Sequence, residues 1–122
     1  MMNVNEVDFL VVDDSRDVAD SLSAVLQAFG HSTQVAYSAQ EALEKAGALR
    51  PMCVMLDIGM PDIDGLQLAR ALRQKFGDNV ILVAVTGYGE DHPRAAETFK
   101  IVDHYFTKPL SAEALRRMLP GR

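Results

Sequence analysis

The chain has 122 residues, of which 48% are hydrophobic and 24% charged, a size and composition typical of one soluble globular domain. Its net charge of −5, with no basic run, argues against direct binding to nucleic acid. No apolar stretch approaches the roughly 20 residues of a membrane-spanning helix, and the opening MMNVNEVD does not resemble a signal peptide. We therefore expect a single cytoplasmic domain over residues 1–122, with a core of about 7–119.

Five short apolar segments predict β-strands. In chain order they are 7–12, 33–37, 52–56, 80–85 and 102–106. The first, third and fourth are apolar throughout, as strands at the centre of a parallel sheet are, whereas the second and fifth are mixed, as edge strands often are. Cys53, the only cysteine, lies within the third segment, so we expect a buried core thiol and no intrachain disulfide.

Between these strands, apolar residues recur every three or four positions, which predicts amphipathic helices. The predicted helical segments are 16–29, 39–46, 68–76, 92–99 and a last one after Ser111. Gly30, Gly47 and Gly77 follow the first three of them, and glycine commonly ends a helix. Strands that alternate with helices indicate an α/β fold, a doubly wound parallel sheet with helices on both faces.

Polar residues follow the strands of this predicted sheet. Asp13 and Asp14 come after the first strand and Asp57 after the third, while Thr86 and Lys108 follow the fourth and fifth. In doubly wound sheets the functional site lies beyond the carboxyl ends of the strands. We therefore expect three carboxylates, one hydroxyl and one ammonium group to gather at one edge of the sheet.

This set of side chains favours phosphoryl transfer. Three neighbouring carboxylates repel one another unless cations compensate their charge. Lys108 supplies one positive charge, and Mg²⁺, which prefers carboxylate, water and phosphate ligands, suits the remainder. The absence of histidine and cysteine at these positions argues against zinc. A carboxylate beside Mg²⁺ and lysine is a nucleophile towards phosphorus, so we expect an aspartyl-phosphate at one of these carboxylates, with the Thr86 hydroxyl available to donate a hydrogen bond.

The segments VVDDS, MLDIGMPDIDG, VTG and YFTKP, in this order and spacing, resemble the response-regulator receiver domain of two-component signalling. The resemblance covers essentially the whole chain and implies a five-stranded, flavodoxin-like sheet of order 2-1-3-4-5. It also implies that Asp57 accepts a phosphoryl group from the phosphohistidine of a histidine kinase or a histidine phosphotransfer protein, and that the domain then acts on a downstream target. The segments LDIGMP and TGYGED are similar to those of receivers fused to histidine kinases.

The same resemblance implies roles for individual residues. The implied ligands of Mg²⁺ are the carboxylates of Asp13, Asp14 and Asp57 and the backbone carbonyl of Gly59. Lys108 would contact the phosphoryl group, and the peptide bond between Lys108 and Pro109 would be cis. Thr86 and Tyr105 would form a switch pair, in which Thr86 moves to the phosphate and the Tyr105 ring turns inward. The readout would be the face built from the fourth helix, the fifth strand and the last helix.

Two positions depart from the common receiver pattern. Ile101 occupies a place shortly before the fifth strand where receivers commonly carry glycine, and Gly87 follows Thr86 where a small residue such as alanine is frequent. The three histidines, His31, His92 and His104, share no spacing typical of metal ligands, and we expect them on the surface.

Other interpretations compete with the phosphoacceptor. Asp13 and Asp14 could cap the first helix, and Asp57 could simply begin a turn. A Mg²⁺-dependent phosphohydrolase of the haloacid-dehalogenase type also forms an aspartyl-phosphate, but it places a second aspartate two positions further on, where this chain has Gly59. A third alternative is an interaction module that shares the fold without being phosphorylated.

Overall fold

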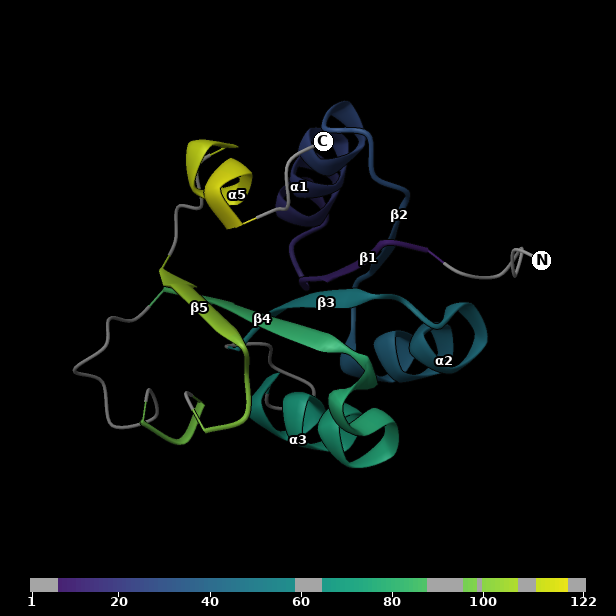
Figure 1. Ribbon diagram of the computed structural model, residues 1–122. Helices are drawn as coiled ribbons and strands as arrows, with labels where there is room; N and C mark the ends of the chain where they lie inside the picture. The colour runs from purple at the N-terminus through teal and green to yellow at the C-terminus, as the bar shows by residue number, and fades with distance from the viewer. Residues whose placement is uncertain (1–6, 59–64, 88–95, 99, 108–111, 119–122) are drawn as a thin grey trace.

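The computed structural model describes residues 7–58, 65–87, 96–98, 100–107 and 112–118. Five parallel strands form one sheet in the order β2-β1-β3-β4-β5, as predicted (Figure 1). The strands are β1 Phe9–Val12, β2 Thr33–Ala36, β3 Cys53–Asp57, β4 Ile81–Thr86 and β5 His104–Thr107. The central strands β1, β3 and β4 are almost wholly buried, whereas no residue of the edge strand β5 is buried, which confirms the predicted division into central and edge strands.

Helices cover both faces of the sheet. They are α1 Arg16–Ala28, α2 Ala39–Leu49, α3 Gly65–Phe76 with the short 3₁₀ turn Gly77–Asn79, and α5 Ala112–Met118. Figure 1 shows α1 and α5 on one face and α2 and α3 on the other. Residues 96–98 are helical, but most of the predicted segment 92–99 lies outside the described residues. Within the described ranges, no helix is both long and apolar enough to cross a membrane.

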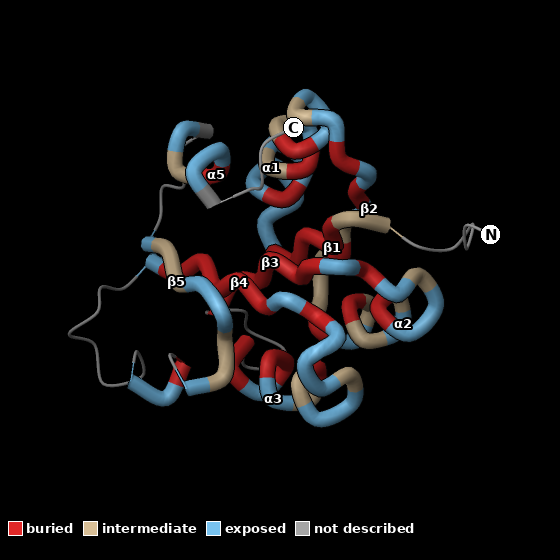
Figure 2. The backbone as a smooth tube through the Cα atoms, viewed as in Figure 1, coloured by how far each residue is buried: buried red, intermediate tan, exposed pale blue. Residues whose placement is uncertain are grey.

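Alternate residues of the strands fill two hydrophobic cores, one on each face of the sheet. Figure 2 shows the central strands as mostly buried. The core under α2 and α3 includes Leu10, Val12, Val54, Leu56, Leu82 and Ala84. The core under α1 and α5 includes Val11, Met55, Val83, Val85 and the predicted buried thiol of Cys53. Because successive side chains of a strand point to opposite faces, strands that are apolar throughout can serve both cores.

The predicted helix ends are right at two glycines and wrong at the third. Gly30 and Gly77 have φ angles of 93° and 59°, in the left-handed region where glycine is favoured. Gly47, however, does not end α2, which continues to Leu49 and is capped by Arg50. The packing of α2 on the sheet through its buried alanines outweighs the cost of about 1 kcal/mol that an interior glycine imposes on a helix.

One arginine joins α3 to the segment that leads into β5. The Arg73 guanidinium donates hydrogen bonds to the backbone carbonyls of Gly77, Val80 and Ile101 and to the Asp103 carboxylate, with donor–acceptor distances of 2.7–3.2 Å. Asp103 in turn accepts from the Leu82 N–H at 2.8 Å. Partial burial raises the pKa of Asp103, but the hydrogen bonds from Leu82 and Arg73 outweigh it and leave the pKa lowered. Arg73 thus fixes the start of the edge strand.

Replacement of this arginine is expected to destabilise the fold. Arg73→Met removes the guanidinium donors from the carbonyls of Val80 and Ile101 and should lower the free energy of unfolding by roughly 2 kcal/mol. A carboxyl with a lowered folded-state pKa contributes stability above its unfolded pKa and loses it as pH falls through the folded pKa. Between neutral pH and about pH 3, the wild type should therefore lose more stability than Arg73→Met.

Urea denaturation at the two pH values measures both effects. Arg70→Met is the matched control, because Arg70 lies on the same helix and, among the described residues, its side chain makes one exposed ion pair, with Glu97. Its effect should stay within about 0.5 kcal/mol. Equal stabilities of the two variants would contradict the role assigned to Arg73.

Candidate functional site

The carboxyl ends of β1 and β3 bring three carboxylates together. The two strands are neighbours in the sheet, with Val12 in register with Leu56. Asp13 follows β1 directly, and Asp57 is the last residue of β3. One carboxylate oxygen from each of Asp13, Asp14 and Asp57 lies within 4.8 Å of the others. The prediction that these residues gather at one edge of the sheet is confirmed.

Two of the three carboxylates are buried. Asp13 is 5% exposed and Asp57 8%, whereas Asp14 is exposed to solvent. Asp13 is also held by its neighbours: its backbone N–H donates to the Ala36 carbonyl, and its Oδ1 accepts from the Ser15 N–H at 2.9 Å. The carboxylates are therefore pre-positioned at the sheet edge, at a high cost in desolvation and mutual repulsion.

The helix-capping interpretation fits Ser15 better than the aspartates. Ser15 is the N-cap of α1, and its hydroxyl accepts a hydrogen bond from the Val18 N–H. Ser15 thus provides the cap, and the Asp14 carboxylate remains exposed at the edge of the acidic cluster. The hydrogen bond from the Ser15 N–H to Asp13 Oδ1 orders the segment between these two residues.

Thr86 lies on β4, the strand next to Asp57, and Tyr105 lies on β5, one strand further from it. Asp57 is in register with Val85, so Thr86, the last residue of β4, lies one position further along the neighbouring strand. Its side chain is almost wholly buried, at 1% exposure. Tyr105 is in register with Ala84 and packs, partly buried, against the core under α3. Three predicted site residues, Gly59, Lys108 and Pro109, lie outside the described residues.

Gly65 contributes to the site by its lack of a side chain. Its N–H donates to the Ile58 carbonyl at 3.1 Å, which holds the first residue of α3 against the end of β3. A Cβ atom added at Gly65 would lie 2.2 Å from the Asp57 carbonyl oxygen and 2.5 Å from the Ile58 Cα. This role was not predicted, because a glycine at the start of a helical segment does not reveal in sequence how closely the helix approaches the strand.

The end of β2 adds a polar group that the sequence analysis did not assign. The Tyr37 hydroxyl donates a hydrogen bond to Asp20 Oδ1 at 2.6 Å, and the Arg16 guanidinium lies 4.2 Å from the centre of the Tyr37 ring. The hydrogen bond to Asp20 raises the pKa of Tyr37, and partial desolvation of this largely exposed hydroxyl group adds to the effect. Arg16 and Tyr37 thus tie the start of α1 to β2 beside the acidic cluster.

The prediction that His31 is a surface residue is wrong. Its side chain is buried, with Nδ1 3.2 Å from Asp8 Oδ2 and its ring edge-on to Phe9. His31 precedes β2, so it lies at the amino end of the sheet, away from the carboxylates. A long-range hydrogen bond of this kind leaves no local pattern in the sequence.

The acidic cluster fits a hard divalent cation. Carboxylate oxygens are the ligands that Mg²⁺ and Ca²⁺ prefer, and the group of residues that could hold an ion in the described part of the chain contains neither histidine nor cysteine. A dication close to Asp13, Asp14 and Asp57 would offset the repulsion among them. The remaining coordination positions would be open to water or to phosphate oxygens.

Comparison of the sequence with known proteins points to the response regulators. Residues 9–120 match the family model of the response regulator receiver domain. Among curated proteins, the chain is 38% identical over 109 residues to the response regulator MprA of Mycolicibacterium vanbaalenii and 37% identical to MprA of Mycobacterium tuberculosis. In both cases the match covers 89% of this chain but only 47% of the relative, so the chain spans about half the length of these proteins.

Solved structures share the fold. A CheY-like receiver domain protein from Methanospirillum hungatei superposes with a TM-score of 0.84 at 25% identity, covering 93% of this chain and 90% of the other. A response regulator from Burkholderia pseudomallei, solved with a phosphorylated aspartic acid, a calcium ion and citrate, superposes with a TM-score of 0.83 at 28% identity, covering 94% and 67%. With its sheet order, its acidic cluster and the match over residues 9–120, this chain belongs to the response regulator receiver domain family.

Proposed function

We propose that the protein is a phosphoacceptor switch, in which Asp57 takes a phosphoryl group from the phosphohistidine of a histidine kinase or a histidine phosphotransfer protein. The observation that carries this proposal is the position of a buried Asp57 at the end of β3, within 4.8 Å of two further carboxylates. The phosphorylated aspartic acid and the calcium ion of the Burkholderia pseudomallei relative support it. The proposed setting is the cytoplasm, and the proposed unit is one receiver domain over 1–122 with its core at about 7–119.

The proposed reaction is an in-line transfer. An oxygen of the Asp57 carboxylate attacks phosphorus, the phosphorus–nitrogen bond of the phosphohistidine breaks, and its electron pair returns to the imidazole. Mg²⁺ bound by Asp13, Asp14, Asp57 and the Gly59 carbonyl would neutralise charge on the phosphoryl oxygens. Lys108 is proposed to contact the same oxygens, and the peptide bond to Pro109 is proposed to be cis.

A metal-dependent labelling experiment tests the proposal. With acetyl phosphate and Mg²⁺, intact-protein mass spectrometry should show one added phosphoryl group, and excess EDTA should reduce the labelling to background. Asp13→Asn removes a buried carboxylate from the cluster and should raise the Mg²⁺ concentration for half-maximal labelling by roughly tenfold or more.

Asp17→Asn provides the matched control. Asp17 is an exposed acid in the first turn of α1, and it is not part of the cluster. Labelling that ignores EDTA, or an equal effect of both substitutions, would contradict the proposed metal site. Catalytic turnover of small phosphomonoesters would instead favour the phosphohydrolase.

Thr86 and Tyr105 are proposed as the residues that report phosphorylation. Thr86→Ala removes the hydroxyl that would bond to the phosphoryl oxygen, so labelling should reach the same stoichiometry while the response of Tyr105 is lost. NMR signals of the Tyr105 ring, recorded before and after phosphorylation, measure that response. The control is Thr107→Ala, since Thr107 is the exposed partner of Thr86 on β5. A Tyr105 response that survives Thr86→Ala would refute the switch pair.

The output of the switch is also a proposal. The face formed by the segment 92–99, β5 and α5 is proposed to bind a downstream target, since phosphorylation would act on Thr86 and Tyr105 beside it. A differential stabilisation of about 5.5 kcal/mol is needed to move a two-state equilibrium from 1:99 to 99:1. New contacts of a phosphoryl dianion with Mg²⁺, Lys108 and Thr86 are of a kind that can supply much of this free energy.

A further inference from the structure

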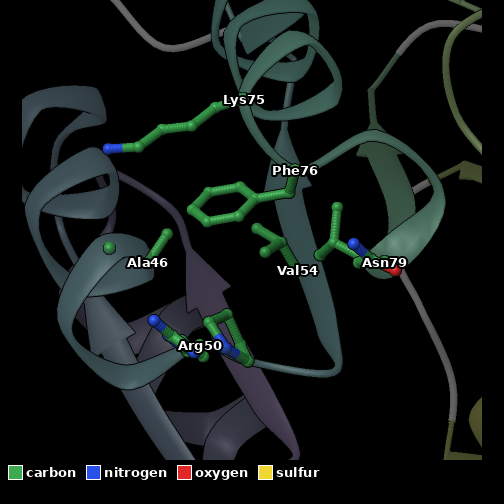
Figure 3. A pocket seen from close by; sticks show the side chains of 9 residues that line it. Ala46, Arg50, Val54, Lys75, Phe76 and Asn79 are labelled. Carbon is green, nitrogen blue, oxygen red and sulfur yellow. The ribbon is translucent and has the colours of Figure 1, made fainter.

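A pocket of about 520 Å³ lies at the end of the sheet opposite the acidic cluster. It is bounded by the ends of α2 and α3 and by the amino ends of β3 and β4 (Figure 3). Its volume falls within the range of roughly 300–1,000 Å³ that is typical of small-molecule sites. It shares no residue with the carboxylate cluster, so the phosphoacceptor function leaves it unexplained.

The inner wall of the pocket is apolar. Val54 and Val80 belong to the core under α3, and Ala46 presents only a methyl group from α2. The Phe76 ring, from the last residue of α3, projects into the middle of the pocket, with Val54 beside it in Figure 3. Phe76 is only partly buried, so its ring offers a flat aromatic surface to a ligand.

The rim of the pocket is positively charged. Arg50 and Lys75 reach it from two different helices, and no carboxylate is among the residues that line it. Across the described residues, neither side chain forms an ion pair with an acid. The Lys75 ammonium lies over the Phe76 ring, 5.6 Å from its centre, so it is close to any planar ligand that contacts that ring. In a chain of net charge −5, two cations that have no acid partner among the described residues, placed around an apolar wall, favour an anionic ligand.

Arg50 also has an unfavourable backbone conformation. Its φ and ψ angles are 48° and 61°, and within the described part of the chain it is the one residue other than glycine that has a positive φ. Glycine or asparagine is usual at such a helix end, because other residues are strained there. The backbone conformation alone therefore does not explain why this position carries an arginine. A role of the Arg50 side chain in the pocket would explain it.

We propose that this pocket binds a small organic anion with a planar apolar body. The ring of the ligand lies against Phe76 and Val54, and its acid group pairs with Arg50 and Lys75. Guanidinium and ammonium groups both form charge-assisted hydrogen bonds with carboxylates. The proposal goes beyond the phosphoacceptor function and does not depend on it.

A titration with 2-naphthoate, followed by backbone amide NMR of the full chain, tests this site. Saturable shifts are expected at Gly47, Arg50, Phe76 and Asn79. The uncharged analogue 2-naphthamide has the same ring but no anionic group, and it should bind roughly tenfold more weakly. Absence of saturable shifts at these residues, or equal affinities for the two compounds, would overturn the proposal.

Two substitutions test the cations. Arg50→Gly and Lys75→Gln should each weaken 2-naphthoate binding by roughly tenfold. Glycine suits the left-handed conformation at position 50, so the melting temperature of Arg50→Gly should not fall, and its loss of binding cannot be attributed to unfolding. Arg117→Gln on α5, across the sheet, is the charge-matched control and should bind as the wild type does. Wild-type affinity in both pocket variants would also overturn the proposal.

Discussion

Asp57→Ala is expected to abolish labelling by acetyl phosphate while the fold is retained. The substitution removes the proposed nucleophile, and the other two carboxylates follow a different strand and are proposed as metal ligands rather than as acceptors. The loss should be complete, because a covalent aspartyl-phosphate needs the Asp57 oxygen itself. Intact-protein mass spectrometry measures the extent of labelling, and circular dichroism measures the fold.

The control for this substitution is Asp78→Ala. Asp78 is an exposed acid in the 3₁₀ turn after α3, so its removal changes the net charge equally without touching the cluster. It should be labelled to the wild-type level. Stoichiometric labelling of Asp57→Ala would show that another residue is the acceptor.

Gly65→Ala should damage both the fold and the site. The new methyl group would collide with the Asp57 carbonyl oxygen and the Ile58 Cα, which are backbone atoms that cannot rotate away. Either α3 or the end of β3 must shift, at an expected cost of about 3 kcal/mol in the free energy of unfolding. A displacement of the Asp57 carboxylate by about 1 Å should slow phosphorylation by roughly 100-fold.

Gly87→Ala is the matched control for this substitution. Gly87 directly follows Thr86 at the same edge of the sheet, but an added Cβ atom there would meet no atom within 4 Å. Its stability should change by no more than about 0.5 kcal/mol. Urea denaturation and the rate of labelling measure both effects. Wild-type behaviour of Gly65→Ala would contradict the close approach of α3 to Asp57.

The sequence predicts the sheet well because its signals are local. Apolar runs mark the three central strands, and the polar residues that follow β1 and β3 mark the edge where the carboxylates meet. The order of the strands came from a resemblance between motifs, and the structure confirms it. Alternation of strands and helices alone indicates a parallel sheet but does not specify which strands are neighbours.

The errors arise where distant residues determine the outcome. The predicted fifth strand, 102–106, begins too early, because Val102 closes a turn onto Thr98 and Asp103 is bound by Arg73 from α3. Gly47 fails to end α2 because burial against the sheet sustains the helix. His31 is buried because it meets Asp8 and Phe9 across the start of β1. Apart from the local turn between Val102 and Thr98, these contacts join residues that are far apart in the sequence.

The residues of the site, too, were predicted only in part. The carboxylates could be predicted from their positions after the strands, whereas the role of Gly65 depends on how closely α3 approaches Asp57. A glycine that is required by a close backbone approach looks, in sequence, like any other glycine in a turn.

Mapping of the acceptor residue tests the central claim most directly. After incubation with acetyl phosphate and Mg²⁺, borohydride reduction converts an aspartyl-phosphate into homoserine, which peptide mass spectrometry can assign to one position. The account predicts homoserine at position 57 alone, and only when Mg²⁺ is present. Homoserine at another aspartate, or an unmodified Asp57 in labelled protein, would contradict it.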